Sequence, residues 1–186
     1  MTHTVLTPER EIKAPAVAVS DVSGAAEEIR EGALAFVREK LTAFQRGLDL
    51  IGLLRRSEYF EIFKHGLAIG VADVLARSDQ RVLAVYTYEF QTNTDVEAGE
   101  AVPLNPTLHM LLLVSTPSAA LEAFINSLDR ALVASLKELA LPVLQQRDFI
   151  LEVNLVTKQD IQYQIGYAKL LSSVFAPPLK VWQRGE

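Results

Sequence analysis

The 186-residue chain contains no cysteine, only three histidines and a single tryptophan. The missing thiols exclude disulfides, thiolate metal sites, iron–sulfur clusters and cysteine nucleophiles. No apolar run approaches the roughly twenty residues that cross a bilayer. The N-terminus also lacks the basic start and apolar block of a signal peptide. We therefore expect a soluble, cytoplasmic protein that does not associate with membranes.

Basic residues are also fewer than acidic ones. Lysine and arginine number 18 against 23 acidic residues, so the net charge is −5, and no basic stripe gathers the cations. General nucleic-acid binding is therefore not expected. The length fits one domain. Residues 1–23, which hold Pro8 and Pro15 and show little periodicity, are expected to form a flexible arm, and residues 24–186 a single domain.

Catalytic signatures are missing too. The chain has no Gly-x-Ser-x-Gly elbow, no His-Glu-x-x-His pair, no G-x-G-x-x-G loop and no P-loop lysine. The histidines stand alone, without a second ligand at metal-binding spacing. His109 lies within an apolar strand, where a hydrogen-bonded core residue is the expected role. The sequence favours a protein without catalytic activity and does not identify a function.

The chain does contain a dense region of apolar periodicity between Pro106 and Val156. Residues 108–114 form an almost continuous apolar run, which is typical of a strand covered on both faces. Apolar residues then recur at three- and four-residue steps up to Pro142, which indicates a helix with one buried face. Alternation over residues 149–155 predicts another strand. Strand, helix and strand make a βαβ crossover with parallel strands.

Two further strands complete the predicted sheet. Residues 82–90 alternate in polarity and are expected to pair antiparallel with residues 108–114, and residues 179–182 are long enough for a closing strand. Between these regions, a capping box at Thr157 begins a final helix that is expected to continue to Ala176. The predicted fold is α+β: a mixed four-stranded sheet, made of an antiparallel pair and the βαβ unit, packed with about four helices.

A long N-terminal helix is predicted from Ser23 to about Leu54. About thirty residues at a rise of about 1.5 Å each span about 45 Å, against a domain diameter of roughly 40 Å. Such a helix covers the whole domain or projects from it, and a projecting apolar stripe needs a homodimer or protein partner. The stripe residues assigned to that contact are Ile29, Phe36, Val37, Leu41 and Phe44. The alternative is a helix that breaks near Gly47 and wraps its own core.

Another helix is predicted over residues 58–77. Its Gly66 and Gly70 lie four positions apart, a spacing that lets another backbone approach closely. Close packing against a helix or sheet is the expected role of this pair.

The connection from Gln91 to Thr107 is long and acidic, and connections of this kind are usually functional or mobile. Asp95 and Glu97 lie two positions apart and, together with Glu152 on the third strand, offer oxygen ligands to a hard cation such as Mg²⁺. The alternative is that these acids are simply solvated. Apart from Mg²⁺, no cofactor is indicated.

The order helix, strand, long loop, strand, helix, strand over residues 58–156 resembles the small nucleotidyltransferase-like fold. Active members of that family carry a Gly-Ser pair after the first strand and an Asp-x-Asp pair at the second. Here those places hold residues 91–93 (Gln-Thr-Asn) and 107–110 (Thr-Leu-His-Met), while Asp95-Val96-Glu97 has the right spacing but lies before the second strand. The resemblance implies a catalytically silent relative. We expect a non-catalytic protein-interaction or dimerisation module, with a degenerate nucleotide- or metal-binding domain as the alternative.

Overall fold

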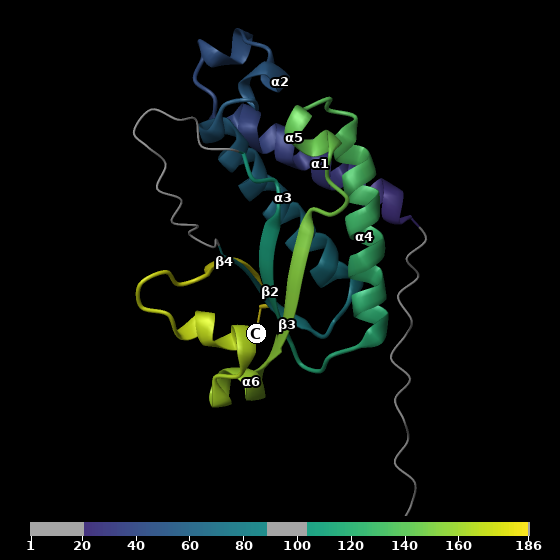
Figure 1. The fold of residues 1–186 in the computed structure, drawn as a ribbon, viewed down its shortest axis with the longest axis vertical. Helices are drawn as coiled ribbons and strands as arrows, with labels where there is room; N and C mark the ends of the chain where they lie inside the picture. The colour runs from purple at the N-terminus through teal and green to yellow at the C-terminus, as the bar shows by residue number, and fades with distance from the viewer. Residues whose placement is uncertain (1–20, 89–103, 186) are drawn as a thin grey trace, which may run out of the picture.

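The computed structural model describes residues 21–88 and 104–185 and has the predicted α+β fold. A mixed sheet of four strands has the order β3-β2-β1-β4. The strands are β1 (Val82–Thr87), β2 (Leu108–Val114), β3 (Leu151–Thr157) and β4 (Leu179–Gln183). β1 pairs antiparallel with β2 and β4, and β2 pairs parallel with β3. The antiparallel pair and the βαβ unit are thereby confirmed (Figure 1).

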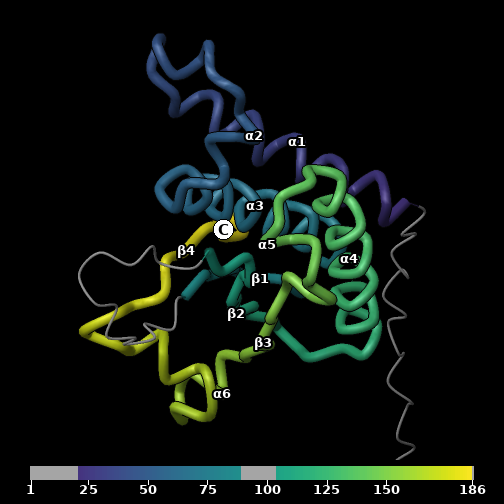
Figure 2. Tube along the Cα trace, turned by 45° about the horizontal axis from the view of Figure 1, so that its top comes forward, coloured from purple at the N-terminus to yellow at the C-terminus, as the bar shows by residue number. Residues whose placement is uncertain are grey.

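Three long helices lie on one side of this sheet. They are α1 (Val22–Lys40), α3 (Ser57–Ser78) and α4 (Ala119–Lys137). Of these, α3 and α4 contact the strands, and α1 packs on both of these helices. Figure 2 shows all three on one side of the strands and the short α6 (Lys158–Tyr163) on the other. Phe60 and Phe63 of α3 and Met110 and Leu112 of β2 are almost fully buried in the core between helices and sheet. No helix in residues 21–88 and 104–185 is long and apolar enough to span a membrane.

A smaller cluster occupies the opposite face of the sheet. Leu111 of β2 and Val156 of β3 pack there with Tyr88 and with Ala168 of the 3₁₀ helix η2 (Gly166–Ser172). Alternate residues of β2 therefore lie in two different clusters. The continuous apolar run of this strand predicted burial on both faces, and the structure confirms it.

The N-terminal helix is shorter than predicted, because α1 ends at Lys40 and Leu41 is extended. The backbone N–H and hydroxyl of Thr42 both donate to Gln45 Oε1 at 2.9 Å, which gives the chain a local alternative to helical hydrogen bonds. Two short elements follow, η1 (Gln45–Gly47) and α2 (Leu50–Leu53), and Asp49 caps α2. The long N-terminal helix is confirmed, but it does not continue to Leu54. The structure has the alternative, a helix that breaks before Gly47 and packs on its own core. The segment containing α2 lies at one end of the molecule, away from the strands (Figure 1).

α1 and α3 pack closely at the two glycines of α3. A Cβ atom added to Gly66 would lie 3.0 Å from Ala33 Cα, and one added to Gly70 would lie 3.3 Å from Ile29 Cγ2. Hydrogen in place of a side chain therefore lets the two helices approach. The predicted role of the glycine pair in close helix packing is confirmed.

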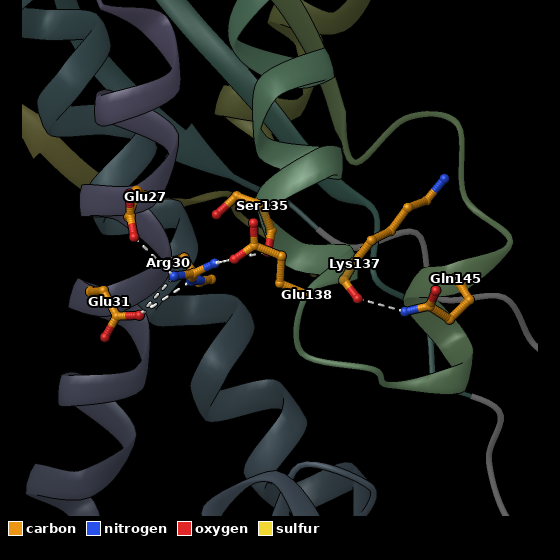
Figure 3. A network of polar contacts seen from close by, with 7 residues as sticks. All are labelled: Glu27, Arg30, Glu31, Ser135, Lys137, Glu138 and Gln145. Atoms are coloured by element: carbon orange, nitrogen blue, oxygen red, sulfur yellow. Dashed lines mark hydrogen bonds and ion pairs between the residues drawn. The ribbon is translucent and has the colours of Figure 1, made fainter.

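Arg30 connects α1 to the end of α4 (Figure 3). Its side chain is only 10% exposed, and it donates to the Ser135 carbonyl over 3.2 Å and to the carboxylates of Glu138, Glu27 and Glu31. Burial alone would lower the pKa of Arg30, but its hydrogen bonds to Glu138 and Glu31 raise the pKa above the usual value. The guanidinium therefore remains charged and joins the two helices.

Two helix ends after residue 136 differ from the prediction. α4 ends at Lys137, and Pro142, which was expected to end it, instead occupies the first turn of α5 (Pro142–Gln145). The predicted final helix begins as expected, because Thr157 and Asp160 form the capping box. It does not continue to Ala176, since Gln164 is left-handed with φ 51° and ends α6. Gly166 then follows with φ 52°, a backbone angle that glycine adopts readily.

Candidate functional site

A pocket of about 330 Å³ lies where β1 ends and β2 begins. Three separate parts of the fold form its wall: the first half of α3, the facing ends of β1 and β2, and the segment before β4. The lining side chains are Glu61, Lys64, His65, Ala68, Thr87, Tyr88, Thr107, Leu108, His109, Ala176, Pro177 and Leu179. Ionisable and hydroxyl groups from distant parts of the sequence thus share one cavity with a few apolar side chains.

Lys64 places a cation in the inner wall of this pocket. It lies one helical turn from Phe60 and from Leu67 on α3, at a position whose neighbours are core residues, and it is only 5% exposed. Its Nζ lies 3.5 Å from Glu61 Oε2, and the Glu61 side chain is 52% exposed. Burying an ammonium group costs free energy that an apolar residue would not cost. Lys64 therefore places a charged group among core residues at the wall of the pocket.

The sheet contributes a second polar group. The pairing of β2 with β3 places His109 opposite Glu152, and His109 Nδ1 lies 3.1 Å from Glu152 Oε2. Asn154, two residues further along β3, donates from Nδ2 to the Tyr88 hydroxyl over 3.0 Å. The ring centroids of Tyr88 and His109 are 5.6 Å apart. Neighbouring strands therefore orient both the imidazole and the phenol.

The Tyr88 hydroxyl remains protonated over the whole physiological pH range. Burial raises the pKa of Tyr88 to about 12, and the charges of Glu152 and Tyr167 act in the same direction. The hydrogen bond from Asn154 opposes this shift and is the smaller effect. A phenol with this pKa keeps its proton at neutral pH and can donate a hydrogen bond.

Of the predicted metal ligands, only Glu152 lies within the described residues. Asp95 and Glu97 lie outside them, so their part of the prediction is untested. Glu152 is next to His109 on the sheet, with its side chain 39% exposed. Across residues 21–88 and 104–185, no three His, Asp or Glu side chains come together as a metal site. The pocket side chains that the structure shows are suited to binding a polar ligand.

The residues assigned to a protein partner divide into two groups. Ile29, Val37 and Leu41 are 1%, 0% and 5% exposed, because α1 packs against α3 and α4 of its own chain. Phe36 is half-buried, with its ring centroid 5.7 Å from that of His65. Phe44, in the segment between α1 and α2, is 82% exposed. Within this group, Phe44 is the side chain most accessible to another protein.

Sequence reasoning missed a group of exposed apolar side chains near the C-terminus. We call it the C-terminal apolar surface and define it as Tyr163, Ile165, Tyr167, Val174, Phe175 and Leu179. Phe175 is fully exposed, at 101%, and Val174 is 87% exposed. The expected continuous helix would have placed Ile165 and Val174 on its packed sides. The signals that indicate otherwise are Gly166 and the Pro177-Pro178 pair, which limit helix length in this region.

Comparison with known proteins returns no match. No protein-family model matches the sequence, and neither a curated protein nor a solved structure is significantly similar to it. The C-terminal apolar surface is therefore the feature from which a function is inferred.

Proposed function

We propose that this chain is a non-catalytic protein-interaction module that binds a second copy of itself through the C-terminal apolar surface. The observation that supports the proposal is the exposure of six large apolar side chains within residues 163–179. Apolar surface in water costs about 25 cal/mol per Å², so large exposed apolar side chains concentrated in one segment favour a protein contact there. A cytoplasmic location is part of this proposal.

The charge distribution favours a second copy as the partner. The chain carries a net charge of −5, so most faces of two copies repel each other when they meet. Residues 161–179 contain no Asp or Glu, and Lys169 is their single charged residue. Two of these surfaces can therefore meet without opposing carboxylates. Closed two-fold dimers are also the commonest soluble oligomers.

The decisive experiment compares two ways of removing exposed apolar side chains. The wild-type chain is expected to sediment at twice its mass of 20.5 kDa. The double variant Val174→Ser/Phe175→Ser is expected to be monomeric with unchanged circular dichroism, because both side chains are exposed in the single chain. Phe44→Ser removes an equally exposed ring elsewhere, at 82%, and is expected to leave the dimer intact.

Three outcomes of the sedimentation experiment contradict the proposal. A wild-type chain that stays monomeric at every concentration rules out a second copy as the partner. A double variant that still dimerises shows that Val174 and Phe175 do not form the contact. Loss of the dimer in Phe44→Ser alone moves the contact to the segment between α1 and α2, as the N-terminal stripe predicted.

A second candidate function is a degenerate nucleotide- or Mg²⁺-binding domain. The supporting observation is the order α3, β1, β2, α4, β3, with an antiparallel and then a parallel pair, on which the resemblance to the nucleotidyltransferase-like fold rests. A ligand at one hundred times its dissociation constant stabilises the folded state by about 2.7 kcal/mol. ATP with Mg²⁺ is expected to raise the melting temperature of wild type but not of Asp95→Ala. An equal rise in both proteins contradicts this candidate.

A further inference from the structure

We propose that the outer edge of β3 binds an extended basic peptide of another protein, which adds to the sheet as an antiparallel fifth strand. β3 is the last strand in the order β3-β2-β1-β4, so β2 is its one strand neighbour among the residues that the structure describes (Figure 1). Backbone groups on the other side of such a strand can pair with a strand from another chain. This inference concerns a partner other than a second copy, and it does not depend on self-association.

The pairing of β3 with β2 determines which backbone groups of β3 face outward. Leu108 N–H donates to the Ile150 carbonyl over 2.7 Å, and the two strands then stay in one parallel register up to Thr157. In a parallel pair, alternate residues of a strand direct their backbone groups at the neighbour. Residues 152, 154 and 156 therefore face β2, whereas residues 151, 153, 155 and 157 face away from it.

Two of the four outward N–H groups are already bonded. Those of Leu151 and Thr157, at the two ends of β3, each donate to a carboxylate over 2.8 Å. In the described parts of the chain, no group accepts from the outward N–H groups of Val153 and Leu155, and both residues are half-buried. An antiparallel partner strand can exchange two hydrogen bonds with each of these residues. The edge therefore offers four backbone hydrogen bonds to a peptide.

The opposite edge of the sheet, β4, is protected against an added strand. β4 has only five residues, Pro177 and Pro178 precede it, and its register with β1 shifts between Val85 and Tyr86. A short strand, neighbouring proline and a bulge all hinder strand addition. β3 has seven residues, without proline, lysine or arginine, and its register with β2 is regular. Of the two edges, β3 therefore suits a partner strand better.

The side chains of β3 determine the two faces of the peptide. Val153 and Leu155 pack against the main core on the helix side of the sheet. Residues directly opposite each other on neighbouring strands point their side chains to the same side. Aliphatic side chains opposite Val153 and Leu155 would therefore extend the core. The peptide residues between them lie on the other side of the sheet, with Glu152 and Asn154.

Three carboxylates determine the charge of the peptide. Glu152 is 39% exposed. Asp129 and Asp160 accept the bonds from the N–H groups at the two ends of β3. Lysine or arginine between the aliphatic residues of the peptide complements these charges. A second copy would instead bring the same three carboxylates to the edge, so charge favours a basic peptide over another copy of this chain.

The test titrates the full-length chain with synthetic peptides and follows the backbone amides of Val153 and Leu155 by NMR. The probe is the capped peptide acetyl-Thr-Val-Lys-Val-Lys-Val-Thr-amide, which alternates aliphatic and basic side chains. Its binding is expected to slow hydrogen exchange at these two amides, because a bonded amide exchanges more slowly. The matched peptide with glutamate in place of both lysines is expected to bind at least about tenfold more weakly.

N-methylated probes separate backbone pairing from side-chain contacts. In an antiparallel strand, the residues opposite Val153 and Leu155 are the valines, and their N–H groups point at β3. Methylating two valine amides is therefore expected to weaken binding at least about tenfold. Methylating the two lysine amides, which point away from β3, is the matched control and is expected to change the affinity by less than about threefold.

Variants of the chain connect binding to β3. Val153→Pro removes one outward N–H without removing a bond to β2 and is expected to weaken the probe at least about tenfold. Glu152→Gln removes a carboxylate at the edge and is expected to weaken the probe by about two- to fivefold. The control Glu39→Gln removes an exposed carboxylate at the end of α1 and is expected to have no effect. If Val153→Pro fails to fold, the N-methylated probes still test the pairing.

Any of four results overturns the proposal. The first is that the probe leaves hydrogen exchange at Val153 and Leu155 unchanged. The second is that methylating the valine amides weakens binding no more than methylating the lysine amides. The third is that the glutamate peptide binds as tightly as the probe, which leaves no role for the acidic edge. The fourth is that a folded Val153→Pro loses the dimer of the wild-type chain, which assigns the edge to a second copy.

Discussion

The packing of α1 on α3 and the C-terminal segment, residues 158–185, are both rich in apolar side chains, but only the first buries them. Ile29 and Ala33 of α1 and Phe63 of α3 are at most 1% exposed. In residues 158–185, Ala168 alone is buried, and Phe175 is fully exposed. The two regions therefore differ in geometry more than in composition.

Helix continuity explains this difference. α1 and α3 run for 19 and 22 residues, so apolar side chains at helical spacing stay on one face and meet another face. α6 has six residues before the left-handed Gln164, and the residues beyond it no longer share a face. We infer that the helical region supplies most of the stability, while the C-terminal segment is available for binding.

The largest expected effect tests this contrast with one substitution in each region. Phe63→Ala is expected to lower the free energy of unfolding by about 3–5 kcal/mol, because it leaves a cavity in the core. Phe175→Ala exposes nothing that is now buried. It is expected to change the free energy of unfolding by less than about 0.5 kcal/mol. Urea unfolding of dilute, monomeric protein measures both values. Similar losses in the two variants contradict the contrast.

A smaller effect tests the helix packing alone. Gly66→Ala is expected to lower the free energy of unfolding by about 1–3 kcal/mol, because α1 must move away from the new methyl group. The matched control is Gly32→Ala on α1, where a Cβ would have no neighbour within 4 Å. There alanine is expected to stabilise the protein by about 1 kcal/mol through helix propensity. Thermal unfolding of the two variants should shift in opposite directions, and shifts of the same sign are evidence against close packing at Gly66.

The smallest effect lies where the C-terminal segment packs on the sheet, at the rings of Tyr88 and Tyr167, whose centroids are 6.1 Å apart. Burial raises the pKa of Tyr88 from 10.0 to about 12, so the folded state holds this proton more tightly than the unfolded state. The resulting stability is complete below pH 10 and is lost as the pH rises from 10 to about 12.

Urea unfolding at a series of pH values in this window measures the Tyr88 contribution. Tyr88→Phe has no ionisable hydroxyl at this position and is expected to lose less stability than wild type as the pH rises. The control Tyr167→Phe, which changes a 42% exposed residue, is expected to resemble wild type more closely. A steeper loss in Tyr88→Phe than in wild type is the result that contradicts the raised pKa.

Much of the fold could be predicted because it depends on patterns that are local in the chain. The run of residues 108–114 predicted a strand buried on both faces, and the Gly66–Gly70 spacing predicted close packing. Helix ends were predicted less well. The bonds from Thr42 to Gln45 and the left-handed Gln164 end helices through single side chains or backbone angles, which periodicity does not register.

The candidate site was harder to predict than the fold. Lys64 had no distinguishing signal in the sequence, because a lysine on a helix is usually solvated. Lys64 is buried because α3 packs near the ends of β1 and β2, an arrangement that the local sequence does not indicate. His109 was expected to be a hydrogen-bonded core residue. The structure shows it largely buried beside Glu152, and also places it in the wall of the pocket, which the sequence did not predict.

The sequence by itself determined the α+β class, the βαβ unit, the lack of thiol chemistry and the acidic net charge, since each depends on composition or on spacing within one element. The tertiary structure decided which apolar residues remain exposed and which polar residues share a cavity. Ile29 was assigned to a partner and is buried, whereas Phe175 is fully exposed. The physical reason is that exposure and pocket formation depend on how segments far apart in the chain pack together, such as those that bring Lys64 and Pro177 to the wall of one pocket.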